Sequence, residues 1–237
     1  MNEWRPRRFW KDAAVEAVPG GHALRLDGRP VRSPAKTEVI VPSRALAERM
    51  ADEWRAQGEL VEPLAMPLTR AANAALDKVT PQRGEVAALL TEYGASDLLC
   101  YRAEGPQGLV ARQRQGWDPL LDWAAGRFGA RLAVTTGVIP VAQPANALEP
   151  MRAALDALDA WEMTAAHEFV TLSGSLVLGL AAMEGVAAPE ALWALSRIDE
   201  EWQAEQWGED EEAAQAAEAR RAAFLQAHLF LSLLREG

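Results

Sequence analysis

The sequence has one cysteine and three histidines, and both scarcities exclude kinds of site. Cys100 alone cannot form an intramolecular disulfide, which fits a reducing compartment. Three scattered histidines and one cysteine cannot supply a conventional zinc site. His167-Glu168 begins like a zinc-protease helix, but Thr171 stands where the second histidine would be needed. We therefore expect no metal and no cofactor.

Long apolar runs and targeting signals are also missing. The most apolar stretch, residues 169–183, is interrupted by serines and glycines and is shorter than the ~20 residues that span a bilayer. We interpret it as part of a buried helix over residues 162–184, in which Gly174 and Gly179 mark close helix crossings. The N-terminus resembles neither a signal peptide nor a transit peptide. We expect a location in the bacterial cytoplasm and no membrane insertion.

Familiar catalytic motifs are absent. The sequence has no Walker-type phosphate loop, no G-x-G-x-x-G turn and no G-x-S-x-G elbow. Cys100 lies between large apolar residues without a nearby base, which is typical of a packing residue rather than a nucleophile. We therefore expect no catalytic residue and no enzyme. The alternative is a small-molecule enzyme with an active site in an interdomain cleft, to which Asp97, Arg102 and Asp118 would contribute.

Positive charge is scarce after the first 42 residues. The chain has a net charge of −10, although residues 1–42 contain eight Lys or Arg against five Asp or Glu, so the remainder carries −13. Such a surface repels nucleic acid, and we expect no nucleic-acid partner. Hydrophobic residues make up 49% of the chain and charged residues 24%, a balance that is typical of a globular protein with a packed core.

Two kinds of pattern meet near residue 42. Before it, short alternating runs are separated by Pro19-Gly20-Gly21 and by Asp27-Gly28, which is typical of antiparallel strands joined by tight turns. After it, apolar residues recur at helical spacing. We predict an α+β fold with a small N-terminal antiparallel β domain (residues 1–42) and a larger, mainly α-helical domain (residues 43–237). Helices are expected near residues 43–57, 67–79, 81–94, 107–128, 147–160, 162–184, 189–207 and 210–235.

The most unusual segment, residues 199–212, contains eight carboxylates and no Lys or Arg. Its first acids would lie late in the helix expected over residues 189–207, where the helix macrodipole disfavours each by about a few tenths of a kcal/mol. Gly208 is expected to end that helix in a left-handed conformation, and Asp210 to cap the next one. The segment is either a solvated acidic face or a docking surface for a basic partner.

Tryptophans accompany these acids. Trp193, Trp202 and Trp207 lie in or beside the segment, and the whole chain has nine tryptophans. Aromatic anchors with a charged rim are typical of the energetic centre of an interface. A tryptophan on the buried side of an amphipathic helix is at least as common, so the pattern alone leaves both interpretations open.

Several short strings occur in a distinctive order and spacing. They are Arg8-Phe9-Trp10-Lys11-Asp12, Leu26 through Pro34, Val41-Pro42-Ser43, Glu53-Trp54, Met66-Pro67-Leu68-Thr69, Asp97 through Arg102, Trp117 through Trp123 and Ser196 through Gly208. With these strings the chain resembles the assembly chaperone that serves the alpha subunit of the F-type ATP synthase catalytic sector, known in mitochondria and in some alphaproteobacteria.

The resemblance implies a chaperone without a cofactor. Such a protein binds the unassembled alpha subunit, shields the apolar surface that later contacts beta and prevents aggregation until beta replaces it. Relatives in eukaryotes reside in the mitochondrial matrix, and we expect a monomer. A purely structural subunit would instead form a permanent complex. The expected partner-binding residues are Asp199, Glu200, Glu201, Gln203, Trp207 and Gly208, with Trp193 beside them.

Overall fold

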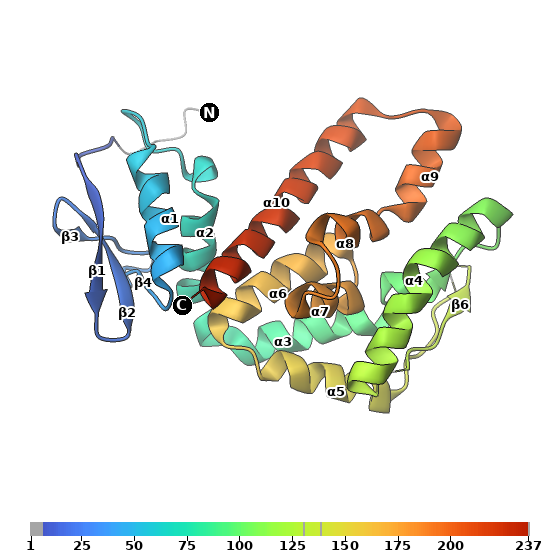
Figure 1. Ribbon diagram of the computed structural model, residues 1–237. Coiled ribbons are helices and arrows are strands. Elements are labelled where there is room, and N and C mark those ends of the chain that lie inside the picture. Colours follow the sequence, from blue (N-terminus) through green and yellow to red (C-terminus); the bar gives the residue numbers. More distant parts are fainter. Residues whose placement is uncertain (1–6, 130, 138, 237) are drawn as a thin grey trace. The chain divides into compact units, whose positions relative to one another are not determined.

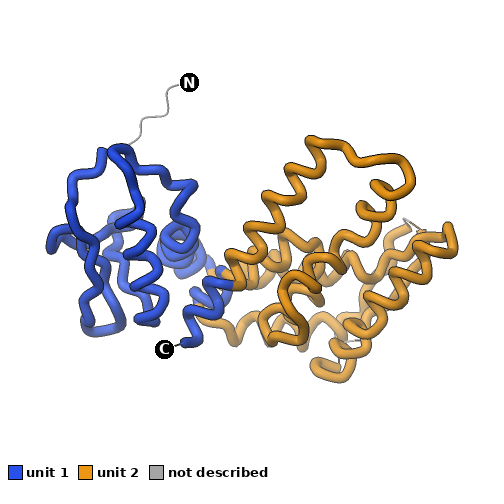
Figure 2. Tube along the Cα trace, turned by 45° about the horizontal axis from the view of Figure 1, so that its top comes forward, with its two compact units in different colours: residues 1–82, 160–164, 229–237 blue, residues 83–159, 165–228 orange. Residues whose placement is uncertain are grey.

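The structure is a computed structural model that describes residues 7–129, 131–137 and 139–236. The N-terminal residues used above to predict the location lie outside this part. Contacts divide the chain into two compact units, which are described separately (Figure 2). The first unit comprises residues 1–82, 160–164 and 229–237, and the second comprises residues 83–159 and 165–228. The predicted division after residue 42 marks the change from strands to helices, whereas packing keeps the next two helices with the sheet.

Four strands open the chain, and the elements after them are mainly helices, with two short strands among them (Figure 1). The strands are β1 (Ala13–Val18), β2 (Gly21–Leu26), β3 (Arg29–Pro30), β4 (Ile40–Val41), β5 (Tyr101–Arg102) and β6 (Thr135–Thr136). The α-helices are α1 (Arg44–Arg55), α2 (Pro67–Ala74), α3 (Thr80–Ala95), α4 (Gln107–Phe128), α5 (Ala145–Asp156), α6 (Ala160–Ser173), α7 (Leu176–Glu184), α8 (Pro189–Leu195), α9 (Ile198–Trp207) and α10 (Glu211–Arg235). Shorter helical turns are η1 (Pro63–Ala65), η2 (Ala75–Val79) and η3 (Leu98–Cys100). The α+β fold class is confirmed.

The first unit is built on a small antiparallel sheet. β1 pairs with β2 along its whole length, and the Asp27-Gly28 turn leads into β3, as the sequence predicts. β4 then returns to pair with β2, where Val41 lies opposite His22. A Cβ on Gly21 would lie 2.3 Å from the carbonyl oxygen of Val41, so only glycine permits this close pairing. α1 packs on β1 and β2.

In this unit, residues of the short strings that carry the family resemblance form hydrogen bonds with one another and cap helices. The Glu53 carboxylate on α1 accepts hydrogen bonds from the backbone N–H groups of Leu68 and Thr69, at 2.7 and 2.8 Å, and so caps α2. The Asp27 carboxylate accepts from the backbone N–H of Asp12 at 2.9 Å, and these bonds hold the pKa of Asp27 below its usual value. Ser43 caps α1 by accepting from the Leu46 N–H. These strings stabilise the fold.

The core of the second unit is α7, in which every residue from Leu176 to Met183 is buried. The predicted single helix over residues 162–184 is wrong, because it is divided into α6 and α7 by Gly174 at φ +72°. Gly174 therefore ends a helix instead of marking a crossing. Gly179 does mark one, since a Cβ there would lie 2.3 Å from a side-chain carbon of Val170 on α6. Within the described residues, no helix has the length and apolarity to cross a membrane.

Candidate functional site

The acidic segment begins at a break between two helices. The predicted continuous helix over residues 189–207 is wrong, because α8 ends at Leu195 and α9 starts at Ile198. At the break the Ser196 hydroxyl donates to the carbonyl of Trp193 at 2.6 Å. The acids at positions 199–201 therefore occupy the first turn of α9, where the macrodipole stabilises negative charge. The expected electrostatic penalty on these three carboxylates is replaced by a favourable interaction.

α9 lies against a smooth side of α4. A Cβ on Gly108 would lie 2.6 Å from the Trp202 ring, and a Cβ on Gly116 would lie 2.7 Å from a methyl of Leu195. The two glycines are eight residues apart on α4 and therefore share one side of the helix. Their missing side chains let the Trp202 ring and the break between α8 and α9 approach the α4 backbone directly. α4 thus serves as the platform that positions the acidic segment.

Between these glycines, Arg112 forms a two-pronged ion pair with Glu205. The guanidinium nitrogens donate to the two carboxylate oxygens at 2.7 and 2.6 Å, and the guanidinium lies 4.8 Å from the Trp202 ring centre. Hydrogen bonding from Arg112 lowers the pKa of Glu205, and the same bonds raise the pKa of Arg112. This bidentate, stacked geometry is the kind that fixes two helices in register.

A second bond between α4 and α9 is partly buried. The Gln113 side chain is 1% exposed; its amide nitrogen donates to Asp199 Oδ1 at 2.6 Å, and its amide oxygen accepts from the Ala103 N–H at 2.9 Å. Asp199 is thus tethered to the platform. Because Oδ1 of Asp199 accepts this hydrogen bond within the chain, the first role of Asp199 is to hold α9 in place.

The other residues predicted to contact a partner differ in their exposure to solvent and in whether they form an ion pair within the chain. Glu200 pairs with Arg197 at 2.7 Å on the surface. Glu201 and Gln203 are exposed and Glu201 forms no ion pair within the described residues. Trp207 is 80% exposed at the end of α9. The last turn of α9 therefore presents a large apolar side chain to solvent.

Two further expectations concern residues around that end. Gly208 has a positive φ of 92°, but its ψ of 160° is extended, so the expected left-handed helical ending is wrong. Asp210 accepts from the Ala213 N–H at 2.9 Å and caps α10 as predicted. Trp193 is only 5% exposed and lies 5.8 Å from the Phe224 ring, so it packs inside the unit and offers little surface to a partner.

Residues named for the alternative enzyme have structural partners. The Asp97 carboxylate is fully buried and accepts from the backbone N–H groups of Leu99 and Val177, both at 3.0 Å. Arg102 donates to Asp118 at 2.7 Å and lies 5.2 Å from the Trp117 ring centre. Asp97 therefore caps helices, and the other two residues form an ion pair.

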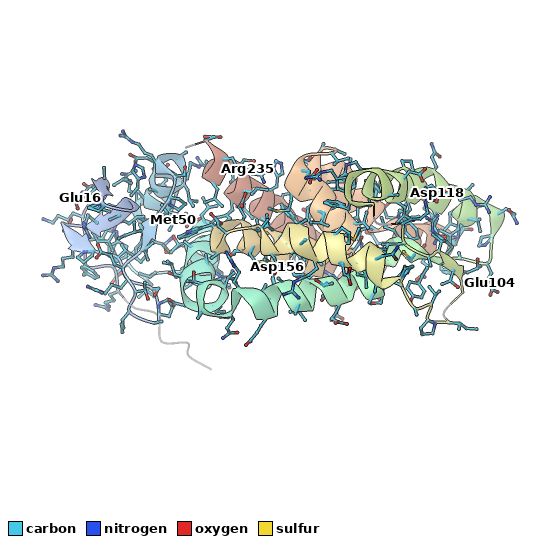
Figure 3. All side chains as sticks on the ribbon, turned by 90° about the horizontal axis from the view of Figure 1, so that it is seen from below. Glu16, Met50, Glu104, Asp118, Asp156 and Arg235 are labelled. Atoms are coloured by element: carbon cyan, nitrogen blue, oxygen red, sulfur yellow. The ribbon has the colours of Figure 1, made fainter. Side chains whose placement is uncertain are left out.

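Asp118, whose side chain is labelled in Figure 3, also borders a hollow on the second unit. This hollow of about 230 Å³ is lined by Asp118, Leu121, Asp122, Arg131, Leu132 and Val134. Arg131 pairs with Asp122 across 3.6 Å, and Asp118 pairs with Arg102, so each charged side chain in the lining has an oppositely charged partner. The described part of the chain contains no group of three or more metal-ligating side chains. Cys100 is buried as predicted, and burial raises the pKa of its thiol to about 12.

The α4 platform was not predicted from the sequence. Its signal is the spacing of Gly108, Arg112 and Gly116, which places two glycines one turn to either side of an arginine. Two glycines in a helix interior are unfavourable by about 1 kcal/mol each relative to alanine, so their presence indicates a close approach of another segment. What approaches them could not be read from α4 alone.

Comparisons with known proteins agree with this fold. The family model described as ATP12 chaperone protein matches residues 7–125. The crystal structure of Atp12 from Paracoccus denitrificans is 50% identical with a TM-score of 0.94, covering 98% of this chain and 100% of that one. An Asp-to-Lys variant of the Paracoccus denitrificans protein gives 49% identity and a TM-score of 0.93, with 96% and 97% of the two chains covered.

A mitochondrial relative is also similar. The mitochondrial atp12 protein of Schizosaccharomyces pombe is 28% identical over 219 residues, which are 87% of this chain and 75% of that protein. These findings confirm the resemblance seen in the sequence. The chain belongs to the ATP12 family of chaperones, which act in assembly of the ATP synthase.

Proposed function

We propose that this chain binds the unassembled alpha subunit of the ATP synthase catalytic sector and shields its apolar, beta-facing surface until beta replaces it. The observation that carries the proposal is Trp207, a tryptophan 80% exposed at the end of a helix whose first turn is acidic. An exposed aromatic anchor is an unfavourable surface for a free protein, and it is the residue type most enriched in interface centres.

The acids of α9 divide into two groups with different roles. Asp199 and Glu205 are engaged by side chains of α4, and they hold the helix. Glu201 and Gln203 are exposed and available to a partner at the same time as Trp207, and Glu200 is exposed in a surface ion pair with Arg197. In this arrangement Trp207 supplies contact area, while the exposed carboxylates raise the association rate and select a partner of opposite charge.

The mechanism needs neither catalysis nor a cofactor. A chaperone that beta displaces must bind specifically but with moderate affinity, and mass action then gives the exchange its direction. We propose that the chain acts as a monomer in the bacterial cytoplasm and hydrolyses nothing during this exchange.

The test is capture of purified alpha subunit. Equimolar chain is expected to suppress light scattering by unassembled alpha but not by beta, and a complex seen by size exclusion is expected to dissolve when beta is added. Failure of the chain to suppress alpha scattering would refute the proposal.

Two variants connect capture to the site. Glu200→Gln combined with Glu201→Gln is expected to weaken capture and leave folding intact, and Trp207→Ala is expected to weaken it by about ten-fold or more. The matched control is Glu85→Gln with Glu92→Gln, which removes two exposed carboxylates from α3 in the same unit. Equal capture by the α9 acid variant and wild type would remove the acids from the mechanism.

A further inference from the structure

The last turn of α9, which presents Trp207, has little support from the core of the second unit. Of residues 198–207, all of which the structure describes, only Ile198 is buried, and every residue from 205 to 213 is exposed. A helix end without core contacts opens readily, because local stability follows the number of buried apolar contacts. The orientation of Trp207 therefore depends on contacts that α9 makes at its surface.

One ion pair supplies such a contact. Arg112 on α4 donates to both carboxylate oxygens of Glu205, and its guanidinium lies 4.8 Å from the centre of the Trp202 ring. Trp202 and Glu205 are three residues apart and so lie on the same side of α9. In the described part of the chain, residues 206–213 form no hydrogen bond or ion pair with another helix. Arg112 is therefore the last side chain from another helix that holds α9 before Trp207.

Helical geometry relates this ion pair to the opposite side of α9. Successive residues of an α-helix are about 100° apart around its axis, so Trp207 lies about 160° away from Glu205. Glu200, Gln203 and Trp207 follow the i, i+3, i+7 spacing and share one side, and all three are exposed. We call this side the outward side of α9. While Arg112 holds Glu205 against α4, the outward side faces away from α4.

We propose that Arg112 is a positioning residue for capture of the client: its bond to Glu205 fixes the rotation and the last turn of α9, and so keeps the outward side presented to the alpha subunit. This inference rests on the proposed function, because it names a residue that prepares the same capture step. A contact surface that is already fixed loses less conformational entropy on binding, so release of the last turn should weaken affinity.

On charge alone, the presence of Arg112 should weaken capture. The proposed contact attracts a partner of opposite charge through exposed carboxylates. The pKa of Arg112 is raised by its hydrogen bonds to Glu205 and also by the charge of Glu201, so its guanidinium neutralises part of this acidic surface. Removal of the guanidinium should therefore tighten capture if only charge matters, and weaken capture if Arg112 positions α9. The two effects have opposite signs.

A matched ion pair lies elsewhere on α4. Arg127 donates to Glu184, the last residue of α7, at 3.0 Å, and its guanidinium lies 4.9 Å from the Phe128 ring centre. The Arg112 and Arg127 side chains are similarly exposed, at 42% and 54%. Arg127→Gln thus removes the same kind of interaction from the same helix and leaves the contacts of α9 unchanged.

The test compares four full-length variants with wild type. Arg112→Gln breaks the pair, Arg112→Glu places two carboxylates opposite each other, and Arg127→Gln is the control. Arg112→Glu combined with Glu205→Arg restores an ion pair in reversed order. Urea unfolding should show all variants folded under assay conditions, because exposed ion pairs contribute little to stability. Affinity is measured by fluorescence anisotropy of labelled alpha subunit, and opening of residues 203–208 by amide hydrogen exchange of the free chain.

Arg112→Gln and Arg112→Glu are expected to raise the Kd by about three- to ten-fold and to speed exchange at residues 203–208, because a smaller fraction of the chain then holds α9 in the binding orientation. The reversed pair should return the Kd to within about two-fold of wild type, and Arg127→Gln should stay within the same range.

Unchanged or tighter binding by Arg112→Gln, or an equal loss in Arg127→Gln, would refute the positioning role. Failure of the reversed pair to restore affinity would refute it too, because Arg112 would then act by direct contact with the client. No binding of alpha by wild type would overturn the proposed function itself, so the two failures are distinguishable.

Discussion

Asp97 offers the sharpest test of the packing described for the second unit. Its carboxylate accepts hydrogen bonds from the Ser175 hydroxyl at 2.7 Å and from the Leu99 and Val177 N–H groups at 3.0 Å. It nevertheless has no contact with solvent. Burial outweighs these bonds and raises the pKa of Asp97 from 3.8 to about 6.

The sign of the pH dependence follows from that pKa. Because the folded protein holds the Asp97 proton more tightly than the unfolded chain, protonation stabilises the fold. The stabilisation is complete below pH 3.8 and is lost as the pH rises through about 6. The full difference amounts to about 3 kcal/mol, of which about 1.4 kcal/mol develops between pH 8 and pH 5.

Asp97→Asn removes this titration while keeping the shape of the side chain. We expect the free energy of unfolding of wild type, relative to that of the variant, to increase by about 1.4 kcal/mol when the pH is lowered from 8 to 5. The assay is urea unfolding followed by tryptophan fluorescence at both pH values, with dilute protein because the isoelectric point is about 4.9. Parallel profiles for the two proteins would refute the reasoning. A change of the opposite sign would show that the hydrogen bonds outweigh burial.

Two other predictions concern the same unit. Gly108→Ala should lower the free energy of unfolding by about 1–3 kcal/mol, because its Cβ would lie 2.6 Å from the Trp202 ring, whereas Gly126→Ala on the same helix meets nothing within 4 Å and should raise it by up to about 1 kcal/mol. Urea titration of both variants decides this, and stabilisation by both would contradict the close packing of α4 and α9. Cys100, whose thiol pKa is raised to about 12 by burial and then by the Asp97 charge, should react with iodoacetamide at pH 8 only in urea. Rapid labelling of the native protein would show that the thiol is accessible.

The local features of the fold, its turns, helix caps and change from strands to helices, were predictable from the sequence. The Asp27-Gly28 turn, the caps at Ser43 and Asp210 and the change from strands to helices each depend on a few adjacent residues. Turns and helix caps of this kind are formed by residues within a few positions of one another. They can therefore be recognised from a short stretch of sequence. The strings that carry the family resemblance also make contacts over longer separations, because the Glu53 carboxylate accepts from the Leu68 N–H, 15 positions away, and the Trp117 indole donates to the Leu195 carbonyl, 78 positions away.

The helix breaks at Gly174 and Ser196 were not predicted, although each lies in a pattern that is helical by periodicity. Gly174 adopts a positive φ, and α7 then turns so that Gly179 meets α6. At Ser196 the chain leaves the helix while Leu195 packs on α4. Apolar periodicity continues through both positions because the residues on either side are buried, but against different neighbours.

The sequence by itself determined the α+β class, the family and the accumulation of acids around Trp207. Only the tertiary structure decided which acids are tethered and which are free, because that depends on residues of α4. The Arg112–Glu205 ion pair joins residues 93 positions apart, and the Gln113–Asp199 bond joins residues 86 positions apart. A charge pattern records how many carboxylates a segment carries, whereas their partners are set by the packing of distant helices.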